Sequence, residues 1–123
     1  MERTPIRTFE DLECWKACRE LRLFVAREVV RSLPKEERFR RGDQLLRAAR
    51  STTANIAEGY GRESPGSYVS FLRTAQGSLK ELETHILLAE RLGIVADTAK
   101  CLDQCASVGK LLRALMRSIP SEK

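Results

Sequence analysis

The sequence predicts an all-α fold, an antiparallel up-down-up-down four-helix bundle. Apolar residues recur every three or four positions over four long segments, which is the spacing of one helix face. No segment alternates apolar and polar residues with the period of two that is typical of a strand. Short links join the four amphipathic segments, and such links favour antiparallel neighbours. With 123 residues and 42% hydrophobic content, the chain can fill the core of one such domain.

We expect residues 1–8 to be a disordered lead-in, residues 9–119 to form the bundle and residues 120–123 to be a tail. The first helix is predicted from Phe9 to Leu33, with Thr8 as its N-cap and Pro34 as its stop. Residues 34–42 then form a polar linker in which Phe39 is the residue expected to pack against the core. The inward face of this helix is expected to consist of Leu12, Trp15, Cys18, Leu21, Val25, Val29 and Leu33.

The second helix is expected to begin at Asp43 as its N-cap and to end near Glu58, before Gly59 and Gly61 interrupt the chain. Residues 48–57 of this helix are rich in alanine and threonine. Small side chains let a neighbouring backbone approach closely, so we expect the tightest packing of the bundle here. The inward face is expected to consist of Leu45, Ala49, Thr52 and Ile56.

The third helix is predicted from Pro65 to about Leu92, with Ser64 as its N-cap and Gly93 at its end. Gly77 lies inside this helix, where glycine costs about 1 kcal/mol relative to alanine, and therefore predicts a close crossing by another helix. The apolar residues repeat with heptad spacing, which favours long antiparallel packing. They are Tyr68, Phe71 or Leu72, Ala75, Leu79, Leu82, Ile86 and Ala89.

The fourth helix is predicted from Asp97 or Thr98 to near Ser118, because Pro120 cannot continue it. Its inward face is expected to consist of Leu102, Cys105, Val108 or Gly109, Leu112, Leu115 or Met116, and Ile119.

Four cysteines form two i,i+4 pairs, one on the first predicted helix and one on the fourth: Cys14 with Cys18, and Cys101 with Cys105. Four thiols on two helices raise the question of a zinc site. In an antiparallel bundle, however, the two pairs would lie on the order of 15 Å apart along the axis. We therefore expect structural thiols, with no bound metal and no cofactor.

The sequence contains no arrangement of residues that predicts catalysis. His85 is the one histidine, and its neighbours in the sequence show no Ser-His-Asp or Cys-His arrangement that would make it a catalytic base. Glu81 and Glu83 point in different directions on one helix, and Glu83 is expected to pair with an arginine of a neighbouring helix. Asn55 is expected to fix helix packing by bonding across an interface. A ribonuclease reading would rest on Glu58, Glu83 and His85, and we expect a non-enzyme.

The candidate binding surface is basic. Six arginines and two acids give residues 38–62 a charge of +4, most of the net +5 of the chain. Arginine binds phosphate bidentately, and a tyrosine among the arginines can stack on a base. The residues concerned are Arg38, Arg40, Arg41, Arg47, Arg50, Tyr60 and Arg62. Two interpretations stay open: contact with RNA or DNA, or a solvated face or subunit interface that pairs with acids.

The sequence shows neither a signal peptide nor a membrane-spanning segment. The start of the chain lacks the apolar stretch of a signal peptide, and no apolar run approaches the ~20 residues of a membrane span. We expect a cytoplasmic protein with reduced thiols, no membrane partner and no small-molecule substrate.

Four blocks of the sequence occur in an order that matches a known family. They are FEDLECWK at residues 9–16, LPKEERF at 33–39, RAARSTTANIAEGYGR at 47–62 and AQGSLKELET at 75–84. Together they resemble the four-helix bundle proteins encoded in intervening sequences of 23S ribosomal RNA genes. The chain departs from the family pattern at Thr53, near which proline is frequent, and at Gln76, where the family has arginine.

This resemblance implies assembly and partners beyond the fold. Proteins of the family are similar to the accessory proteins of diversity-generating retroelements, which are basic helical bundles that form pentamers and bind nucleic acid and reverse transcriptase. The resemblance therefore implies a non-catalytic, ring-like homo-oligomer, a pentamer by analogy, that binds RNA or DNA. The alternative that it implies is a protein-interaction scaffold or a retroelement accessory protein that contacts a reverse transcriptase.

Overall fold

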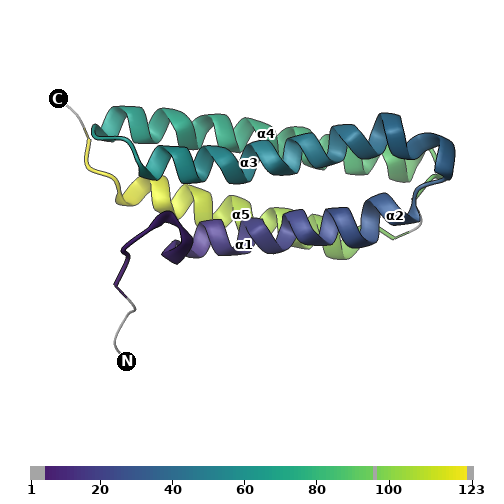
Figure 1. The fold of residues 1–123 in the computed structure, drawn as a ribbon, viewed down its shortest axis with the longest axis horizontal. Coiled ribbons are helices and arrows are strands. Elements are labelled where there is room, and N and C mark those ends of the chain that lie inside the picture. The colour runs from purple at the N-terminus through teal and green to yellow at the C-terminus, as the bar shows by residue number, and fades with distance from the viewer. Residues whose placement is uncertain (1–4, 96, 122–123) are drawn as a thin grey trace.

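The computed structural model describes residues 5–95 and 97–121, which fold into an antiparallel up-down-up-down four-helix bundle (Figure 1). The first rod comprises α1 (Glu13–Phe24), the π-helical turn η2 (Val25–Val29) and α2 (Val30–Ser32). The others are α3 (Asp43–Tyr60), α4 (Pro65–Arg91) and α5 (Ala99–Ser118). Within the described residues no strand forms, and the predicted fold class is confirmed. Residues 1–4 of the predicted lead-in and 122–123 of the predicted tail lie outside these ranges.

The four rods pack around a square. α3 contacts α4 on one side and α1 on the other, and α5 contacts α1 and α4 (Figure 1). The face between α1 and α3 is therefore opposite the face between α4 and α5. This arrangement decides which basic side chains share a surface.

One apolar core runs along the bundle, and the predicted helix faces supply it. Each fully buried leucine or isoleucine stabilises the fold by about 1.5–3 kcal/mol. Trp15 is only half-buried and packs edge-on against Phe9, with ring centroids 5.1 Å apart. The largest side chains that are almost fully enclosed are Leu21, Leu33, Leu45, Ile56, Leu72, Leu82, Ile86 and Leu112.

The first α-helix begins later than predicted. Thr8 does act as an N-cap, but the element it caps is a short 3-10 turn, η1 (Phe9–Asp11). The Thr8 hydroxyl accepts the amide of Glu10 at 3.2 Å, and the Asp11 carboxylate accepts the amide of Thr8 at 3.1 Å. Leu12 then adopts an extended conformation and is buried, so α1 starts at Glu13. The reciprocal bonds between Thr8 and Asp11 form a capping box for the 3-10 turn, and the extended Leu12 separates this turn from α1.

The linker is helical rather than irregular. A 3-10 turn, η3 (Lys35–Glu37), and a π turn, η4 (Arg38–Gly42), lead without a break into α3. Asp43 is therefore not an N-cap, because Gly42 before it is already helical, at φ −60° and ψ −42°. The prediction that Phe39 packs against the core is also wrong, since its side chain is 90% exposed.

Arg38 holds the linker in place of Phe39. Its guanidinium donates to the carbonyl of Leu33 at 3.2 Å and to that of Arg31 at 3.1 Å. These carbonyls belong to the end of the first rod, where helical acceptors lack intrahelical partners. The predicted stop at Pro34 is confirmed, because α2 ends at Ser32 and Leu33 is extended.

The tightest contact is that between α3 and α4, as the small residues predicted. Gly59 is buried inside α3, and a Cβ on it would lie 3.0 Å from Phe71 Cβ and 3.1 Å from Tyr68 Cδ1. α3 continues through Gly59 and ends at Tyr60, two residues beyond the predicted end at Glu58, with Gly61 as its C-cap. Glycine here serves close packing rather than chain reversal.

Polar side chains bridge the helices beside this contact. The hydroxyls of Ser51 on α3 and Ser78 on α4 are 2.7 Å apart. The Asn55 amide donates to the Ser51 carbonyl at 2.8 Å and to its hydroxyl at 3.2 Å. Asn55 thus supports the interface through Ser51 and does not itself reach α4.

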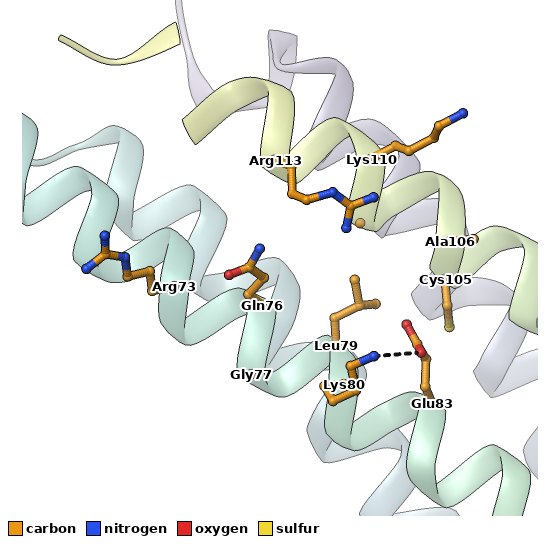
Figure 2. Close-up of a pocket in the computed structure, with 11 residues that line it drawn as sticks. Arg73, Gln76, Gly77, Leu79, Lys80, Glu83, Cys105, Ala106, Lys110 and Arg113 are labelled. Atoms are coloured by element: carbon orange, nitrogen blue, oxygen red, sulfur yellow. Dashed lines mark ion pairs between the residues drawn. The ribbon is translucent and has the colours of Figure 1, made fainter. Parts of the chain in front are cut away.

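The ends of α4 agree with the prediction, but Gly77 does not. The Ser64 hydroxyl caps α4 by accepting the amide of Ser67 at 3.1 Å, and Gly93 ends the helix region with a φ of +74°. The close helix crossing predicted at Gly77 is wrong, since nothing lies within 4 Å of where its Cβ would be. Figure 2 shows Gly77 on the wall of an open groove beside α5.

The two glycines give a matched pair of substitutions. Gly77→Ala should raise the free energy of unfolding by about 1 kcal/mol, because alanine is the better helix former and the space is empty. Gly59→Ala gains the same propensity but must push α4 away, and such overpacking costs about 1–3 kcal/mol. Urea unfolding followed by circular dichroism measures both. Equal stabilisation by the two variants would contradict the close contact at Gly59.

Candidate nucleic-acid interface

The seven predicted binding residues do not form one compact patch. They extend from the linker to the end of α3, a helix of 18 residues and thus about 27 Å long. The structure divides them into a linker group, a middle group and an end group. The groups are Arg38, Arg40 and Arg41; Arg47 and Arg50; and Tyr60 and Arg62.

The linker group is mostly engaged within the chain. Arg38 binds backbone carbonyls, as described above. Arg41 Nε lies 3.0 Å from Glu37 Oε2, and both side chains are about 70% buried. Arg40 is exposed and makes no ion pair within residues 5–95 and 97–121. Of this group, only Arg40 offers an uncommitted charge.

The middle group is exposed, as its predicted position opposite the core requires. Arg47 and Arg50 make no ion pair in the part of the chain that the structure describes. Arg50 borders a shallow hollow of about 240 Å³ between α1 and α3, together with Arg22, Trp15 and Ala57. These two guanidiniums are free to meet a ligand.

The end group packs against the bundle. The rings of Tyr60 and Tyr68 meet edge to face, with centroids 6.3 Å apart, and both are half-buried. Arg62 lies over the Phe71 ring, 4.4 Å from its centroid, and 3.6 Å from the Glu58 carboxylate. Burial raises the pKa of Tyr68 to about 12. Tyr60 and Arg62 thereby fasten the end of α3 to α4.

A second basic surface was missed by the sequence interpretation. A groove of about 800 Å³ opens between α4 and α5, and we call it the α4–α5 groove (Figure 2). The sequence did contain a sign of this groove. Its basic residues are seven apart on α4 and three apart on α5, and residues at these spacings share a helix face. The polar side chains that line it are Arg73, Gln76, Lys80, Glu83, Lys110 and Arg113.

The titratable residues considered for catalysis lie on two helices, Glu58 on α3 and Glu81, Glu83 and His85 on α4. His85 Nε2 lies 3.6 Å from Glu81 Oε1, one turn away. Glu83 pairs with Lys80 of its own helix at 3.5 Å. The prediction that Glu83 pairs with an arginine of a neighbouring helix is wrong. Glu83 pairs instead with Lys80, which lies one turn before it on the same helix.

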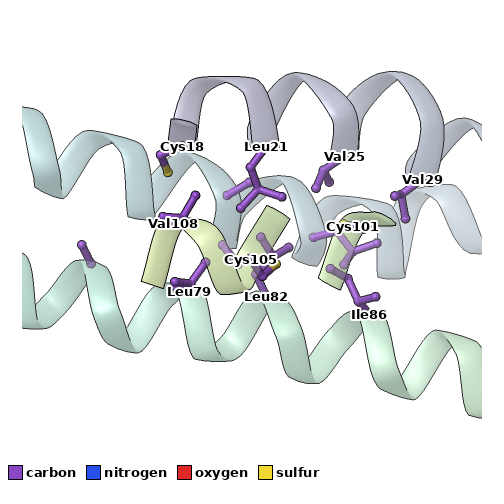
Figure 3. Packing of buried hydrophobic residues seen from close by; sticks show 14 of the residues in the cluster. Cys18, Leu21, Val25, Val29, Leu79, Leu82, Ile86, Cys101, Cys105 and Val108 are labelled. Atoms are coloured by element: carbon purple, nitrogen blue, oxygen red, sulfur yellow. The ribbon is translucent and has the colours of Figure 1, made fainter. Parts of the chain in front are cut away.

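The four cysteines are free and buried within the core. Figure 3 shows Cys18 on the first rod and Cys101 and Cys105 on the antiparallel α5, among leucine and valine side chains. Across residues 5–95 and 97–121, no group of three or more histidine, cysteine or acidic side chains is placed to hold a metal ion.

Burial keeps the thiols of Cys14 and Cys18 protonated. It raises the pKa of Cys14 to about 12 and that of Cys18 to about 11, the latter although the Thr53 hydroxyl lies 3.3 Å from its sulfur. The hydrogen bond that Cys105 donates to Cys101 raises the pKa of Cys105, to which burial adds, and lowers the pKa of Cys101. Cys14, Cys18 and Cys105 thus act as packing groups at neutral pH.

Comparisons with known proteins agree with this architecture. The family model described as 23S rRNA-intervening sequence protein matches residues 10–114. The chain belongs to this family. The match confirms the resemblance read from the four sequence blocks and covers almost the whole bundle of this intervening sequence protein.

A solved structure shares the fold of the intervening sequence protein. It is the crystal structure of a protein with unknown function from the S23 ribosomal protein family of Bacteroides thetaiotaomicron VPI-5482. The TM-score is 0.77 at 19% identity, over 85% of this chain and 99% of that chain. Among curated proteins, no sequence matches. Of the helices that the structure describes, none combines the length and apolar character that crossing a membrane requires.

The buried thiols predict a pH dependence for the stability of this intervening sequence protein. The usual thiol pKa is 9.0, and folding raises it to about 12 at Cys14 and about 11 at Cys18. Their contribution to stability is therefore complete below pH 9 and is lost as the pH rises toward 11–12. Each thiol ionises in the unfolded chain before it ionises in the folded protein. This difference should lower the free energy of unfolding by about 1–2 kcal/mol per thiol between pH 8 and pH 10.5.

Urea unfolding at these two pH values tests this, with the Cys14→Ala/Cys18→Ala variant as the control. The variant should lose less stability than the wild type over the same interval. An identical loss in both proteins would show that these thiols are accessible to solvent in the native state.

Proposed function

We propose that this intervening sequence protein is a non-catalytic, oligomeric four-helix bundle that binds structured RNA or DNA. The binding surface is formed by the arginines along α3, with Arg47 and Arg50 at its centre. The observation that carries the proposal is that these two guanidiniums are exposed, lie one turn apart and are not used in ion pairs among the described residues. Arginine recognises phosphate bidentately, and a net charge of +5 favours approach to a polyanion.

The absence of catalysis is part of this proposal. Cys14 and Cys18 are buried with raised pKa values. Glu58 pairs with Arg62 and Glu83 with Lys80, and Glu81 lies 3.6 Å from His85 Nε2. Neither feature supplies the oriented acid and base that hydrolysis of a phosphodiester needs. Four unpaired cysteines also favour a reducing, cytoplasmic setting.

Self-assembly is the second part, and a different surface supports it. Four large apolar side chains are exposed, one on the linker that leads into α3 and three near the end of α4. They are Phe39 at 90%, Leu87 at 44%, Leu88 at 43% and Leu92 at 52% exposure. Figure 1 shows that the two segments lie at the same end of the bundle. Exposed apolar side chains at one end of the bundle favour a protein contact, which here is a second copy of the chain in a homo-oligomer, a pentamer by analogy. A reverse transcriptase is the alternative partner for the same surface.

The arginine surface is tested by charge reversal. Arg47→Glu/Arg50→Glu should weaken binding to a structured RNA by about 10-fold or more, because each change removes a charge-assisted contact and adds a repulsive charge. Affinity of the wild type should also fall steeply with salt, as phosphate contacts require. Fluorescence anisotropy at several salt concentrations measures both effects.

The control for this experiment is Arg27→Glu/Arg117→Glu. It makes the same change of charge at exposed arginines of the first rod and α5, and Arg27 lies on the side of the first rod that borders α5. An equal loss of affinity in both double variants would show that binding depends on net charge alone. It would contradict a specific binding surface on α3.

The apolar surface is tested separately. Leu88→Glu/Leu92→Glu should shift the protein to a smaller assembly in size-exclusion chromatography with light scattering, since buried carboxylates at a contact are costly. Ser70→Glu/Thr74→Glu is the matched control, with the same spacing on exposed positions of α4. If the wild type is itself a monomer at high concentration, the oligomer proposal fails.

A further inference from the structure

The α4–α5 groove is a built cavity that the proposed function does not use. It lies on the face of the bundle opposite the α1–α3 face that holds Arg50. Its floor is formed by Leu79, Cys105 and Gly109, and its volume is about 800 Å³. Polar and charged side chains from both helices form its walls (Figure 2).

The charge of the groove is strongly positive. Arg73 and Lys80 line it from α4, and Lys110 and Arg113 line it from α5. The one acid in the lining, Glu83, is already paired with Lys80 at 3.5 Å. Arg73, Lys110 and Arg113 make no ion pair within the ranges that the structure describes. Three cations therefore remain uncompensated around one hollow.

The backbone makes room for the guanidinium of Arg113 in the groove. Gly109 lies one turn before Arg113, and a Cβ on Gly109 would come within 3.3 Å of Arg113 Nη1. The absent side chain lets the guanidinium fold back over the helix toward Leu79 (Figure 2). On the opposite wall, Gly77 leaves the surface of α4 open. Both glycines cost helix stability and add free space to the groove.

The dimensions favour a ligand with several negative groups. Arg73 and Lys80 are seven residues apart and so about 10 Å apart along α4. Cations at this separation along the α4 wall, together with Lys110 and Arg113 on the α5 wall, can contact more than one anionic group at once. A concave site with an apolar floor also concentrates its field more than the convex surface of α3 does.

We propose that the α4–α5 groove binds a phosphate-bearing ligand with more than one phosphate group, held between Arg73 on α4 and Arg113 on α5. The fork of a guanidinium matches phosphate oxygens bidentately, which a lysine surface does not achieve. Lys110 adds charge at the rim, and Gln76 adds a neutral hydrogen-bonding group between the two arginines. The phosphates come either from a free nucleotide or from the backbone of a nucleic acid strand.

The test uses the full chain and inorganic tripolyphosphate as the probe, with citrate as a polyanion without phosphate. Isothermal titration should show tripolyphosphate binding to the wild type, and amide shifts in NMR spectra should fall on α4 and α5 around the groove. Arg73→Gln/Arg113→Gln should weaken binding roughly 10-fold or more, because two charge-assisted contacts are lost. Both residues are exposed, so the variant should fold, and circular dichroism verifies this.

The Arg47→Glu/Arg50→Glu variant separates this site from the surface on α3. It should keep tripolyphosphate binding at the groove, even if it loses RNA. Absent binding by the wild type, equal binding of citrate, or equal loss in the two double variants would each overturn the groove proposal and leave the α3 surface untouched.

Competition then identifies the source of the phosphates. Displacement of tripolyphosphate by ATP but not by a short single-stranded RNA supports a free nucleotide. Displacement by the RNA, lost in Arg73→Gln/Arg113→Gln, supports a nucleic acid backbone in the groove. Failure of both to displace the probe would overturn the proposal, since the probe would then report an adventitious anion only.

Discussion

The close approach of α3 and α4 at Gly59 is the constraint on which the bundle depends. A Cβ at this position would meet Phe71 and Tyr68 at about 3 Å, so the two helices pack with almost no space between them. Most other buried positions on α3 carry small residues, and a hydrogen bond between Ser51 and Ser78 links the two helices beside this contact. α3 packs against both α4 and α1, and its remaining side faces solvent and carries the exposed Arg47 and Arg50. The packing of α3 thus fixes both the core and the basic surface.

Periodicity was sufficient to predict the helices, their order and most of the buried residues, because these depend on which face of each helix is apolar. It failed at two irregular segments. Thr8 and Asp11 cap a 3-10 turn that ends at the extended Leu12, and the linker is helical, with Arg38 bound to the carbonyls at the end of the first rod. Phe39 is apolar but lies on the outside of that linker. A sequence contains no direct sign of which side a short helical turn will present.

The candidate site was only partly predictable for a related reason. A count of charges along the chain places arginines in one segment but does not say which of them are already bound. Arg38, Arg41 and Arg62 each make contacts within the protein, whereas Arg47 and Arg50 do not within the described residues. The α4–α5 groove is assembled from residues far apart in sequence, such as Arg73 and Arg113, and its hollow depends on how α5 packs beside α4. Positive charge is therefore distributed over two opposite faces of the bundle.

The π turn in the first rod explains a feature of its buried face. Leu21, Val25, Val29 and Leu33 are all buried, although they are spaced by four residues. In a regular α-helix each step of four passes a full turn by about 40°, so three steps would rotate the last residue about 120° away from the core. The bond from the amide of Val30 to the carbonyl of Val25 widens one turn and removes part of that rotation. The π turn therefore accommodates one extra residue within the first rod. The residues before and after it keep their side chains directed toward the core.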